Sequence, residues 1–588
     1  MTRLSATEEL SSVSADTTPA SDIPQQQVRM LKAKNSGPTE VEMQPLAIPP
    51  PSEEVTDVFQ DEVYHKLHTA DVIEAVGFWD AYQGRTTWAT ALDHFLFPPN
   101  LPRSCQLLRP ENIAIPACYL LVGLLQGLSS VMVGVFPLDL KASEAQQTTL
   151  RSLRGLPASF KLVFGFWSDN VPIMGYRRKP YMLAGWFLAS ASQFSLLFFS
   201  NLHLDNTGAG CFADADTDVD PVVPSNAPTI PFFAACILLF AMGFWLADVM
   251  GDSMVAEKAK LEPPHSRGSV QSSCYSYRFF GLMVAAPLAT YLYTAAGPVA
   301  VVRLLAFLPL SILPLVYILE EVRQIDPPST WQQCGEIWMT VSSRAVWQPL
   351  GFVFAYNLLQ IGNAAWREFQ RTVLHFTSCQ INLLGLFAYV LLYAGILTYK
   401  YFLMHYSWQK IYMITTLANG FFSIFQVLLI YGITFGLPAF WFALGDDVFL
   451  DFVEGIQFLP TTIMMVHLCP VGSEGAAYAM FTTVHNAALN LSSSVSTLML
   501  GIWDVSETAL AEGDIRGMAN LTYLTTALQV SGIFLVGLLP HYKEDLQRLT
   551  GHSSAGGFIF LAVTFFSIGY SVFVSVMNIL FPGWSGES

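Results

Sequence analysis

Residues 165–200 read GFWSDNVPIMGYRRKPYMLAGWFLASASQFSLLFFS, and the character of the chain changes within this stretch. The segment 168–179 contains an Asp, two Arg, a Lys and a Gly-Tyr turn, whereas 180–200 carries no charge. An uncharged run of about 20 mainly apolar residues has the length that an α-helix needs to cross a bilayer. The stretch therefore predicts a membrane-spanning helix that follows a short charged loop.

The same pattern recurs along the chain. Of 588 residues, 52% are hydrophobic and 13% are charged, whereas about a quarter of the residues of a soluble protein are charged. Strands of a membrane β-barrel would be shorter and would alternate in polarity. The chain is therefore predicted to be an all-α polytopic membrane protein with thirteen apolar windows, at 114–137, 146–168, 180–201, 230–250, 270–296, 299–319, 346–366, 380–399, 411–433, 448–468, 475–500, 520–539 and 557–581.

The N-terminal residues differ from the rest in composition. Residues 1–60 are rich in Ser, Thr, Pro, Gln and Glu, which predicts a disordered acidic tail without signal-peptide features. Residues 61–113 are expected to form an amphipathic lead-in at the membrane. The net charge of −16 argues against a nucleic-acid partner. The eight cysteines lack a CxxC pair and are interpreted as small apolar residues, with a Cys211–Cys379 disulfide as the less favoured alternative.

The order of windows and loops predicts two halves. Six windows, a polar linker at 321–345 and six further windows indicate two six-helix bundles, 114–320 and 346–540, which is the major facilitator architecture. The extension 541–588 adds an extra hydrophobic helix that either spans the membrane or packs at the periphery. Lys and Arg favour cytoplasmic loops, and their distribution predicts a cytoplasmic N-terminus and a cytoplasmic loop at 171–179. We expect the protein to reside in the plasma membrane.

The second window carries cations that a membrane helix would normally exclude. Arg151, Arg154 and Lys161 share one helical face at about 100° per residue, and a cation at the depth of Lys161 is costly unless it meets water or a counter-charge. Arg278, with Gln271 on its face, adds a fourth buried cation. These groups predict a wet cationic cavity for an anionic substrate, because Lys and Arg pair with carboxylate and phosphate. Pairing with carboxylates of neighbouring helices is the alternative.

The second half contributes amide and imidazole side chains. Such groups suit a heteroaromatic solute rich in hydrogen-bond donors and acceptors, on whose ring Tyr275, Tyr277 or Trp366 could stack. Hydrogen bonding between helices is the alternative for each of them. The residues expected to contact substrate here are Asn357, Gln360, Asn363, Gln457, His485, Asn486 and Asn490.

A group of carboxylates lies at the end of the fourth window. Asp248 and Asp252 are four residues apart on one helical face, and Glu257 follows them. They could take up protons, since burial and a neighbouring like charge favour the protonated form. The favoured interpretation is that they pair with the basic loop at Arg177 and Arg178 and hold an inner gate shut.

The loop after the second window carries a further candidate for gating. Asp169 is expected to act as a latch that meets a cation or a helix N-terminus of the other bundle. Gly165 and Gly175 are expected to permit close packing and a turn between the second and third windows.

Three motifs resemble the folate–biopterin transporter family, a branch of the major facilitator superfamily. They are LPASFKLVFGFWSDNVPIMGYRRKPYMLAG at 156–185, ADVMGDSMVAEKAK at 247–260 and LPTTIMMVHLCPVGSEGAAYAMFTTVHN at 459–486. The resemblance covers about 114–540 and implies a carrier of folates, pterins or, in some branches, S-adenosylmethionine. The matched positions include Lys161, Asp169, Arg177, Arg178, Asp248, Asp252, Glu257, Glu474 and Asn486.

Transport is the function that these observations favour. We expect a secondary active transporter that moves folate or pterin across the lipid bilayer by alternating access, with Asp248, Asp252 or Glu474 as candidate proton carriers. No P-loop, HExxH or GxSxG motif occurs, so neither ATP-driven pumping nor enzymatic activity is expected, and no cofactor or metal. The acidic run at 446–451 is a weak magnesium candidate. A carrier of S-adenosylmethionine or another small organic anion is the alternative, and a membrane-embedded enzyme or a non-transporting sensor is a remote one.

Overall fold

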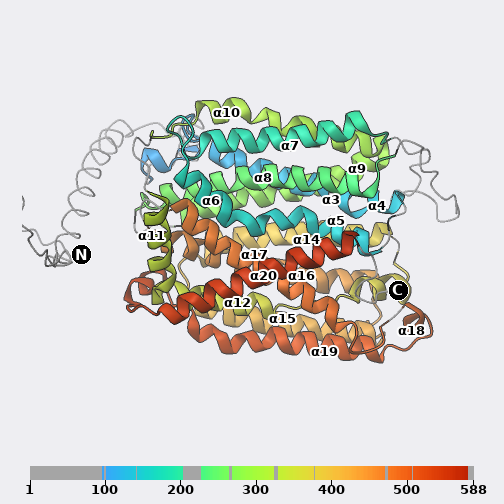
Figure 1. Cartoon of the computed structure of the whole chain (residues 1–588). Coiled ribbons are helices and arrows are strands. Elements are labelled where there is room, and N and C mark those ends of the chain that lie inside the picture. The colour runs from blue at the N-terminus through green and yellow to red at the C-terminus, as the bar shows by residue number, and fades with distance from the viewer. Residues whose placement is uncertain are drawn as a thin grey trace, which may run out of the picture. The chain divides into compact units, whose positions relative to one another are not determined.

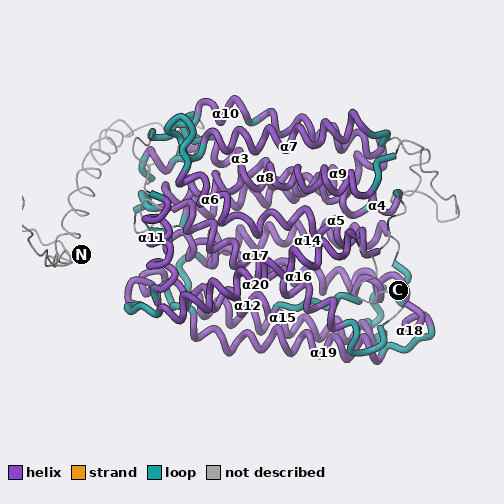
Figure 2. The backbone as a smooth tube through the Cα atoms, viewed as in Figure 1, coloured by secondary structure: helices purple, strands orange, loops and turns teal. Residues whose placement is uncertain are grey.

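A computed structural model describes residues 96–97, 101–140, 142, 144–202, 227–263, 268–323, 329–376, 378–470, 474–505 and 507–580. Within these ranges the chain is mainly helical (Figure 2), and its β contacts are isolated bridges, Ile173 with Tyr176 and Ser343 with His552. The expected tail, most of the lead-in and Cys211 lie outside the described residues. The side chains of Asp446 and Asp447 lie outside them as well.

Every predicted window carries helix, in the expected order (Figure 1). The first half contains α3 (Ala114–Gly134), α5 (Glu144–Gly155), α6 (Lys161–Asn170), α7 (Lys179–Phe199), α8 (Ile230–Ala259), α9 (Ser269–Ser311) and α10 (Leu313–Ile318). The second half contains α12 (Arg344–Leu359), α13 (Trp366–Thr372), α14 (Ser378–Thr398), α15 (Trp408–Ile430), α16 (Ala439–Leu468), α17 (Glu474–Met499) and α19 (Arg516–Ser531). The linker contains α11 (Thr330–Ser342), and the extra C-terminal helix is α20 (Ser554–Leu580).

Among the described residues, nine helices are long and apolar enough to cross a membrane. One of these segments, 269–318, covers two predicted windows. The helix bends there at Gly297, whose φ of 76° costs glycine little. The helices at the other predicted windows are shorter, as in α5, α6 and α12, or richer in Ser, Thr and Asn, as in α17. The extra helix α20 is one of the nine.

The second predicted window is not one straight helix. Residues Leu156–Phe160 form a 3-10 turn between α5 and α6, where Pro157 lacks the N–H group that a continuing α-helix would use. The break separates Arg154 on α5 from Lys161, the first residue of α6. The prediction that Arg151, Arg154 and Lys161 share the face of one continuous helix is therefore wrong.

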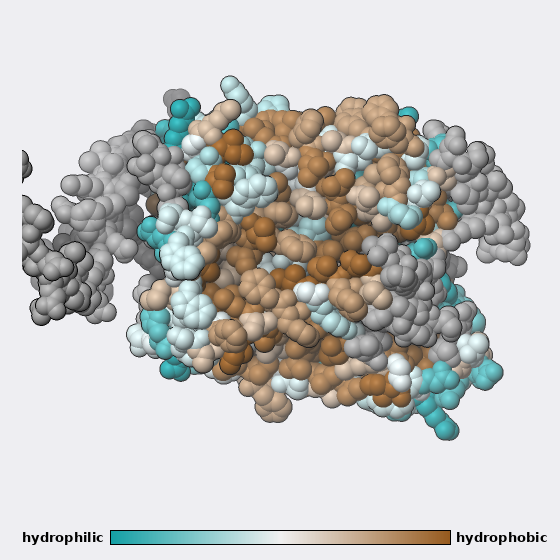
Figure 3. Space-filling view, in the orientation of Figure 1, coloured by the Kyte–Doolittle hydropathy of each residue, from teal (hydrophilic) through white to brown (hydrophobic). Residues whose placement is uncertain are grey.

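Large apolar side chains are exposed over much of the described surface. Phe187, Phe307 and Phe421 are 64%, 59% and 56% exposed. The visible face is hydrophobic through its middle and more hydrophilic towards two opposite ends (Figure 3). Such a surface would associate in water, but it matches the lipid tails of a bilayer. The polar ends are therefore the parts that meet water.

The two halves pack together through α6 with α17 and α9 with α14. Gly165 permits the first contact, because a Cβ at this position would lie 2.7 Å from the Ala479 Cβ and 2.7 Å from the Gly475 carbonyl oxygen. The close packing predicted at Gly165 is therefore present, but its partner is α17 and not the third window.

The loop between α6 and α7 is held by a tight turn. Met174 and Gly175 both have positive φ, 55° and 83°, which is the conformation of a two-residue hairpin turn. The residues on either side, Ile173 and Tyr176, exchange backbone hydrogen bonds of 3.0 Å. We call the end of the molecule at which this loop lies the loop end.

Candidate functional site

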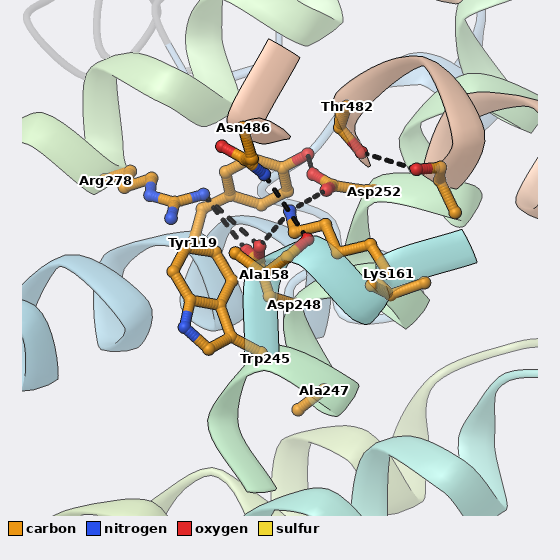
Figure 4. A network of polar contacts seen from close by, with 12 residues as sticks. Tyr119, Ala158, Lys161, Trp245, Ala247, Asp248, Asp252, Arg278, Thr482 and Asn486 are labelled. Carbon is orange, nitrogen blue, oxygen red and sulfur yellow. Dashed lines mark hydrogen bonds and ion pairs between the residues drawn. The ribbon is translucent and has the colours of Figure 1, made fainter. Parts of the chain in front are cut away.

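Four charged side chains of the first half form a buried cluster (Figure 4). Lys161 Nζ donates to Asp248 Oδ2 at 2.6 Å and to Asp252 Oδ2 at 2.9 Å. Arg278 Nη1 donates to Asp248 Oδ1 at 3.1 Å. None of the four residues is more than 7% exposed. Helices α6, α8 and α9 therefore meet at a set of two cations and two carboxylates, which we call the buried ion cluster.

Two aromatic residues support the buried ion cluster. Tyr119 on α3 donates its hydroxyl to Asp252 Oδ1 at 2.5 Å. The ring of Trp245 lies 4.8 Å from Lys161 Nζ and 5.4 Å from Arg278 Cζ, which is the range of cation–π attraction. Buried charges are costly unless they are paired and hydrogen-bonded, and this cluster meets both conditions.

The buried ion cluster changes the interpretation of Asp248 and Asp252. Their expected pairing with the loop at 171–179 is wrong, because their partners are Lys161, Arg278 and Tyr119. Lys161 and Arg278 instead pair with carboxylates of a neighbouring helix, which was the alternative to a cationic cavity. The formal charges of the cluster sum to zero, so it offers an anionic solute no net positive charge in this arrangement.

The two arginines of α5 have different partners from Lys161. Arg154 Nη1 donates to the Gln126 carbonyl oxygen at 2.8 Å and to Ser129 Oγ at 3.2 Å. Arg151 Nη2 donates to the Gly134 carbonyl oxygen at 3.4 Å. Arg154 is half-buried and Arg151 is exposed. Both therefore keep a positive charge that no carboxylate of the described residues neutralises.

Further positive charge from the second half acts on the same region. Arg367 and Arg371, on α13, lie close enough to Arg151 for their charges to act on it. The sequence distinguishes Arg367 and Arg371 only as charges of a loop, because their approach to α5 depends on how the two halves pack.

Asparagines of α17 reach the first half beside the buried ion cluster. Asn490 Nδ2 donates to Ser159 Oγ at 3.0 Å, and Asn486 Nδ2 donates to the Ala158 carbonyl oxygen at 3.4 Å. Asn486 lies near the cluster in Figure 4. Both acceptors belong to the 3-10 turn: one is the Ser159 hydroxyl, and the other is the Ala158 carbonyl group, which lacks the regular partner of an α-helix. The break in the second window therefore supplies polar groups to the contact between the halves.

A tyrosine of α17 joins two predicted site residues. Tyr478 OH accepts from Gln271 Nε2 at 2.8 Å and lies 3.2 Å from the Tyr275 hydroxyl. Gln271 and Tyr275 belong to α9, so this contact also crosses between the halves. Nothing in the sequence distinguishes Tyr478 or Tyr119 from other tyrosines in apolar helices.

The amides predicted in the second half bond to neighbouring helices of that half. Asn357 Nδ2 lies 3.2 Å from His485 Nδ1. Gln457 Nε2 donates to the Tyr356 hydroxyl at 2.9 Å and to Thr415 Oγ1 at 2.8 Å. These contacts fit the alternative of hydrogen bonding between helices.

Two further amides follow α12. Asn363 Nδ2 donates to Thr522 Oγ1 at 2.9 Å. The backbone carbonyl oxygen of Gln360 accepts from Ser492 Oγ at 3.0 Å. The side-chain nitrogen of Gln360 has no hydrogen-bond partner among the described residues. Gln360 thus keeps a free donor.

Asp169, near the end of α6, has the kind of partner that its position predicts. Its Oδ2 accepts from the backbone N–H of Ala476 at 2.8 Å, in the first turn of α17. Its Oδ1 lies 2.5 Å from Arg178 Nη2. A carboxylate is stabilised at a helix N-terminus by unpaired N–H groups and by the helix dipole. The contact connects the two halves at the loop end, and its role as a latch stays a prediction.

Two carboxylates hold the basic loop. Glu257 Oε1 lies 3.5 Å from Arg177 Nη2 and 3.2 Å from Arg178 Nη2. Glu321 accepts the backbone N–H groups of Arg177, Arg178 and Lys179 at 2.7, 2.8 and 2.9 Å. Glu321 carried a usable sequence signal, because it is an acidic residue that opens the linker opposite a basic loop.

A second charged contact joins the halves at the loop end. Lys260 Nζ, just after α8, donates to Glu474 Oε1 at 2.6 Å and to the Pro470 carbonyl oxygen at 2.7 Å. Glu474 is the first residue of α17. We call the contacts Asp169–Ala476 and Lys260–Glu474 the loop-end interlock.

Comparisons with known proteins place the chain among membrane carriers. The model of the BT1 family matches residues 123–215 and 220–552. The chain is 26% identical over 437 residues to a Synechocystis sp. protein named folate-biopterin transporter, which covers 73% of this chain and 82% of the relative. It is 22% identical over 405 residues to folate transporter 1 of Plasmodium falciparum, with coverage of 68% and 74%.

Solved structures agree in fold. A proton:xylose symporter of the major facilitator superfamily aligns with a TM-score of 0.53 over 75% of this chain and 98% of the symporter. The sequence identity of 14% limits this likeness to the fold. The predicted major facilitator fold is therefore confirmed.

Proposed function

Because the chain belongs to the BT1 family, whose curated relatives include folate and folate-biopterin transporters, we propose that it carries folate- and pterin-type solutes by alternating access. It is a multi-pass membrane transporter and not an enzyme. Two packed bundles of helices with polar contacts between them are the parts that a rocking mechanism needs.

The loop-end interlock is the observation that carries the mechanism. Asp169 and Lys260 belong to the first half, and Ala476 and Glu474 belong to the second. These contacts can form only while the halves are close together at the loop end. A solute released at this end would require both contacts to break, so the interlock is the gate in our account.

We propose that proton uptake at the buried ion cluster accompanies transport. Asp252 shares Lys161 with Asp248. Protonation of Asp252 removes one of the two negative charges that hold Lys161, which makes Lys161 available to a substrate carboxylate. Uptake that is unchanged when the proton gradient is collapsed would contradict this coupling and favour exchange or facilitation.

We place the loop end in the cytoplasm, together with the N-terminus, and the protein in the plasma membrane. The support is the concentration of basic residues at that end, among them Arg177, Arg178 and Lys260. An epitope at the N-terminus should be reached by antibody only in permeabilised cells, and staining of intact cells would contradict the orientation.

Uptake of labelled folate, biopterin and S-adenosylmethionine in a host that lacks its own carriers tests the proposed function. We expect saturable uptake of folate, biopterin or both. Uptake of S-adenosylmethionine alone would assign the chain to the alternative substrate, and uptake of none of the three by correctly inserted protein would contradict the proposal.

A further inference from the structure

An exposed carboxylate lies in the middle of α16. Glu454 is about four helical turns from either end of this helix, and its side chain is exposed between the buried residues Val453 and Gly455. It has no hydrogen bond and no ion pair with any part of the chain that the structure describes. An ionisable residue at this depth is rare and is normally functional, because an unpaired charge in lipid is costly.

The contacts of neighbouring residues fix the direction in which Glu454 points. Phe458 packs edge-on against Tyr275 and Phe279 of α9, with ring centroids 4.8 and 5.1 Å apart. Gln457 bonds to α12 and α15 at 2.9 and 2.8 Å. Residues three and four apart share a helical face, so Glu454 lies between these two directions. It therefore points between α9 of the first half and helices α12 and α15 of the second half.

One flank of α16 beside Glu454 is closed. A Cβ on Gly455 would overlap the Leu392 carbonyl group of α14, so this flank of the helix packs against protein. Glu454 is therefore exposed on the side of α16 that carries Gln457 and Phe458, the residues that contact α9, α12 and α15. An unpaired carboxylate at this position requires hydration by water.

Arg154 provides an opposite charge at a similar depth in the first half. Both residues lie at a similar sequence distance from the loop end: α16 ends at Leu468, and Arg154 on α5 is followed by the 3-10 turn and by α6, which ends at Asn170. The buried ion cluster is neutral as a whole, whereas Arg154 bonds only to the neutral oxygens of Gln126 and Ser129 among the described residues. Among the described residues, the first half thus offers a cation without a carboxylate partner, and the second half offers a carboxylate without a cationic partner.

We propose that Glu454 binds the N–H donor edge of the substrate ring while Arg154 binds the substrate carboxylates, an inference that rests on the proposed function. A 2-amino-4-oxopteridine ring presents two parallel donors, its ring N–H and its exocyclic amino group. A carboxylate accepts both, whereas a carboxamide supplies an acceptor and a donor and can match only one. The glutamate end of folate presents carboxylates, which suit a guanidinium group.

The test distinguishes recognition of the pterin end of the substrate from recognition of its glutamate end. Uptake of labelled folate and of labelled biopterin is measured for the wild type, Glu454→Gln and Arg154→Gln. Competition with folate is measured for p-aminobenzoylglutamate, which has the glutamate end without the pterin. We expect Glu454→Gln to raise the KM for folate and for biopterin about tenfold, with the inhibition constant of p-aminobenzoylglutamate unchanged. Arg154→Gln should raise the KM for folate and the inhibition constant of p-aminobenzoylglutamate by a similar factor, and it should leave the KM for biopterin unchanged.

A control variant and a wild-type measurement keep this test independent of folding. Glu512→Gln removes an exposed carboxylate of a loop and should change no KM. On the wild-type protein, a folate analogue without the 2-amino group should compete about tenfold more weakly than folate.

Four outcomes would overturn the inference. An unchanged KM for both substrates in Glu454→Gln, or equal competition by the analogue without the amino group, would remove Glu454 from the binding site. Loss of the pH dependence of uptake with unchanged KM would assign Glu454 to proton transfer instead. A wild type that takes up neither folate nor biopterin would contradict the proposed function itself, which distinguishes the two failures.

Discussion

Lys161 is the residue on which the buried ion cluster depends most. It is bonded to two carboxylates from one helix, and only Asp248 has a second cation, Arg278. Breaking a buried ion pair by removing one partner costs about 3–5 kcal/mol, because a charge remains buried without compensation. The stability of the first half and the availability of Lys161 to substrate are therefore linked.

Lys161→Ala should lower both the yield of folded protein and the melting temperature in detergent. The double variant Lys161→Ala/Asp252→Asn removes one charge of each sign and should recover much of the melting temperature without recovering transport. Thermal unfolding of the purified variants measures this. Equal melting temperatures for the wild type and Lys161→Ala would contradict the assigned pairing.

Lys260 and Glu474 form the contact of the loop-end interlock that a charge exchange can test. Glu474→Lys places two cations together and should hold the loop end open and slow uptake about tenfold or more. The exchanged pair, Lys260→Glu with Glu474→Lys, should recover most of the uptake. Failure of the exchange to recover any uptake, at normal levels of the protein in the membrane, would argue against a gate at this contact.

At the scale of elements, the contact of α6 with α17 depends on small residues. Gly165 lies against Ala479 and Gly475, and a Cβ on Gly475 would in turn meet the Arg178 guanidinium at 2.6 Å. Two helices can approach this closely only where side chains are missing. The 3-10 turn before α6 aims this helix at α17, so the break in the second window and the glycines act together.

Gly165→Ala should therefore wedge α6 away from α17 and reduce transport about tenfold, while the protein still folds. Gly351→Ala on α12 is the matched control, since nothing lies within 4 Å of a Cβ at that position. Initial rates of folate or biopterin uptake, normalised to protein in the membrane, compare the two variants. Equal uptake rates for Gly165→Ala and Gly351→Ala would show that closure of the loop end does not require the close contact of α6 with α17.

At the scale of the whole molecule, helix α20 connects parts that the two-bundle plan keeps separate. It packs against α5 of the first half, α17 of the second half and α11 of the linker. Its start is tied to the linker by backbone hydrogen bonds, Arg344 to Gly551 at 2.9 Å and Ser553 to Ser342 at 2.8 Å. Any rocking of the halves must therefore move α20 or slide along it.

Sequence reasoning predicted the fold because lipid imposes a simple rule on every span. Backbone groups in a bilayer must bond within their own helix, so each apolar window became helix regardless of its partners. The break at Pro157 was readable in principle from the missing N–H group. The register between helices was not readable, because helical spacing shows that Asp248 and Asp252 share a face but not which helix that face meets.

The sequence predicted which residues belong to the candidate site better than it predicted which of them contact one another. Lys161, Arg278, Asp248 and Asp252 were expected in two separate roles, and packing brought them into one cluster. Glu454 was missed because a single carboxylate within an apolar window has no partner at helical spacing that would mark it. Its significance follows only from the direction of α16, which is a property of the assembled molecule.

The most direct test of alternating access is the distance between two spin labels at the loop end. The labels are placed at Val171 of the first half and Tyr406 before α15 of the second half, which are 50% and 60% exposed. The eight native cysteines are replaced, and the protein is reconstituted in liposomes. We predict a short and a longer distance whose populations shift when folate or biopterin is added. A single short distance that neither substrate changes would contradict the account.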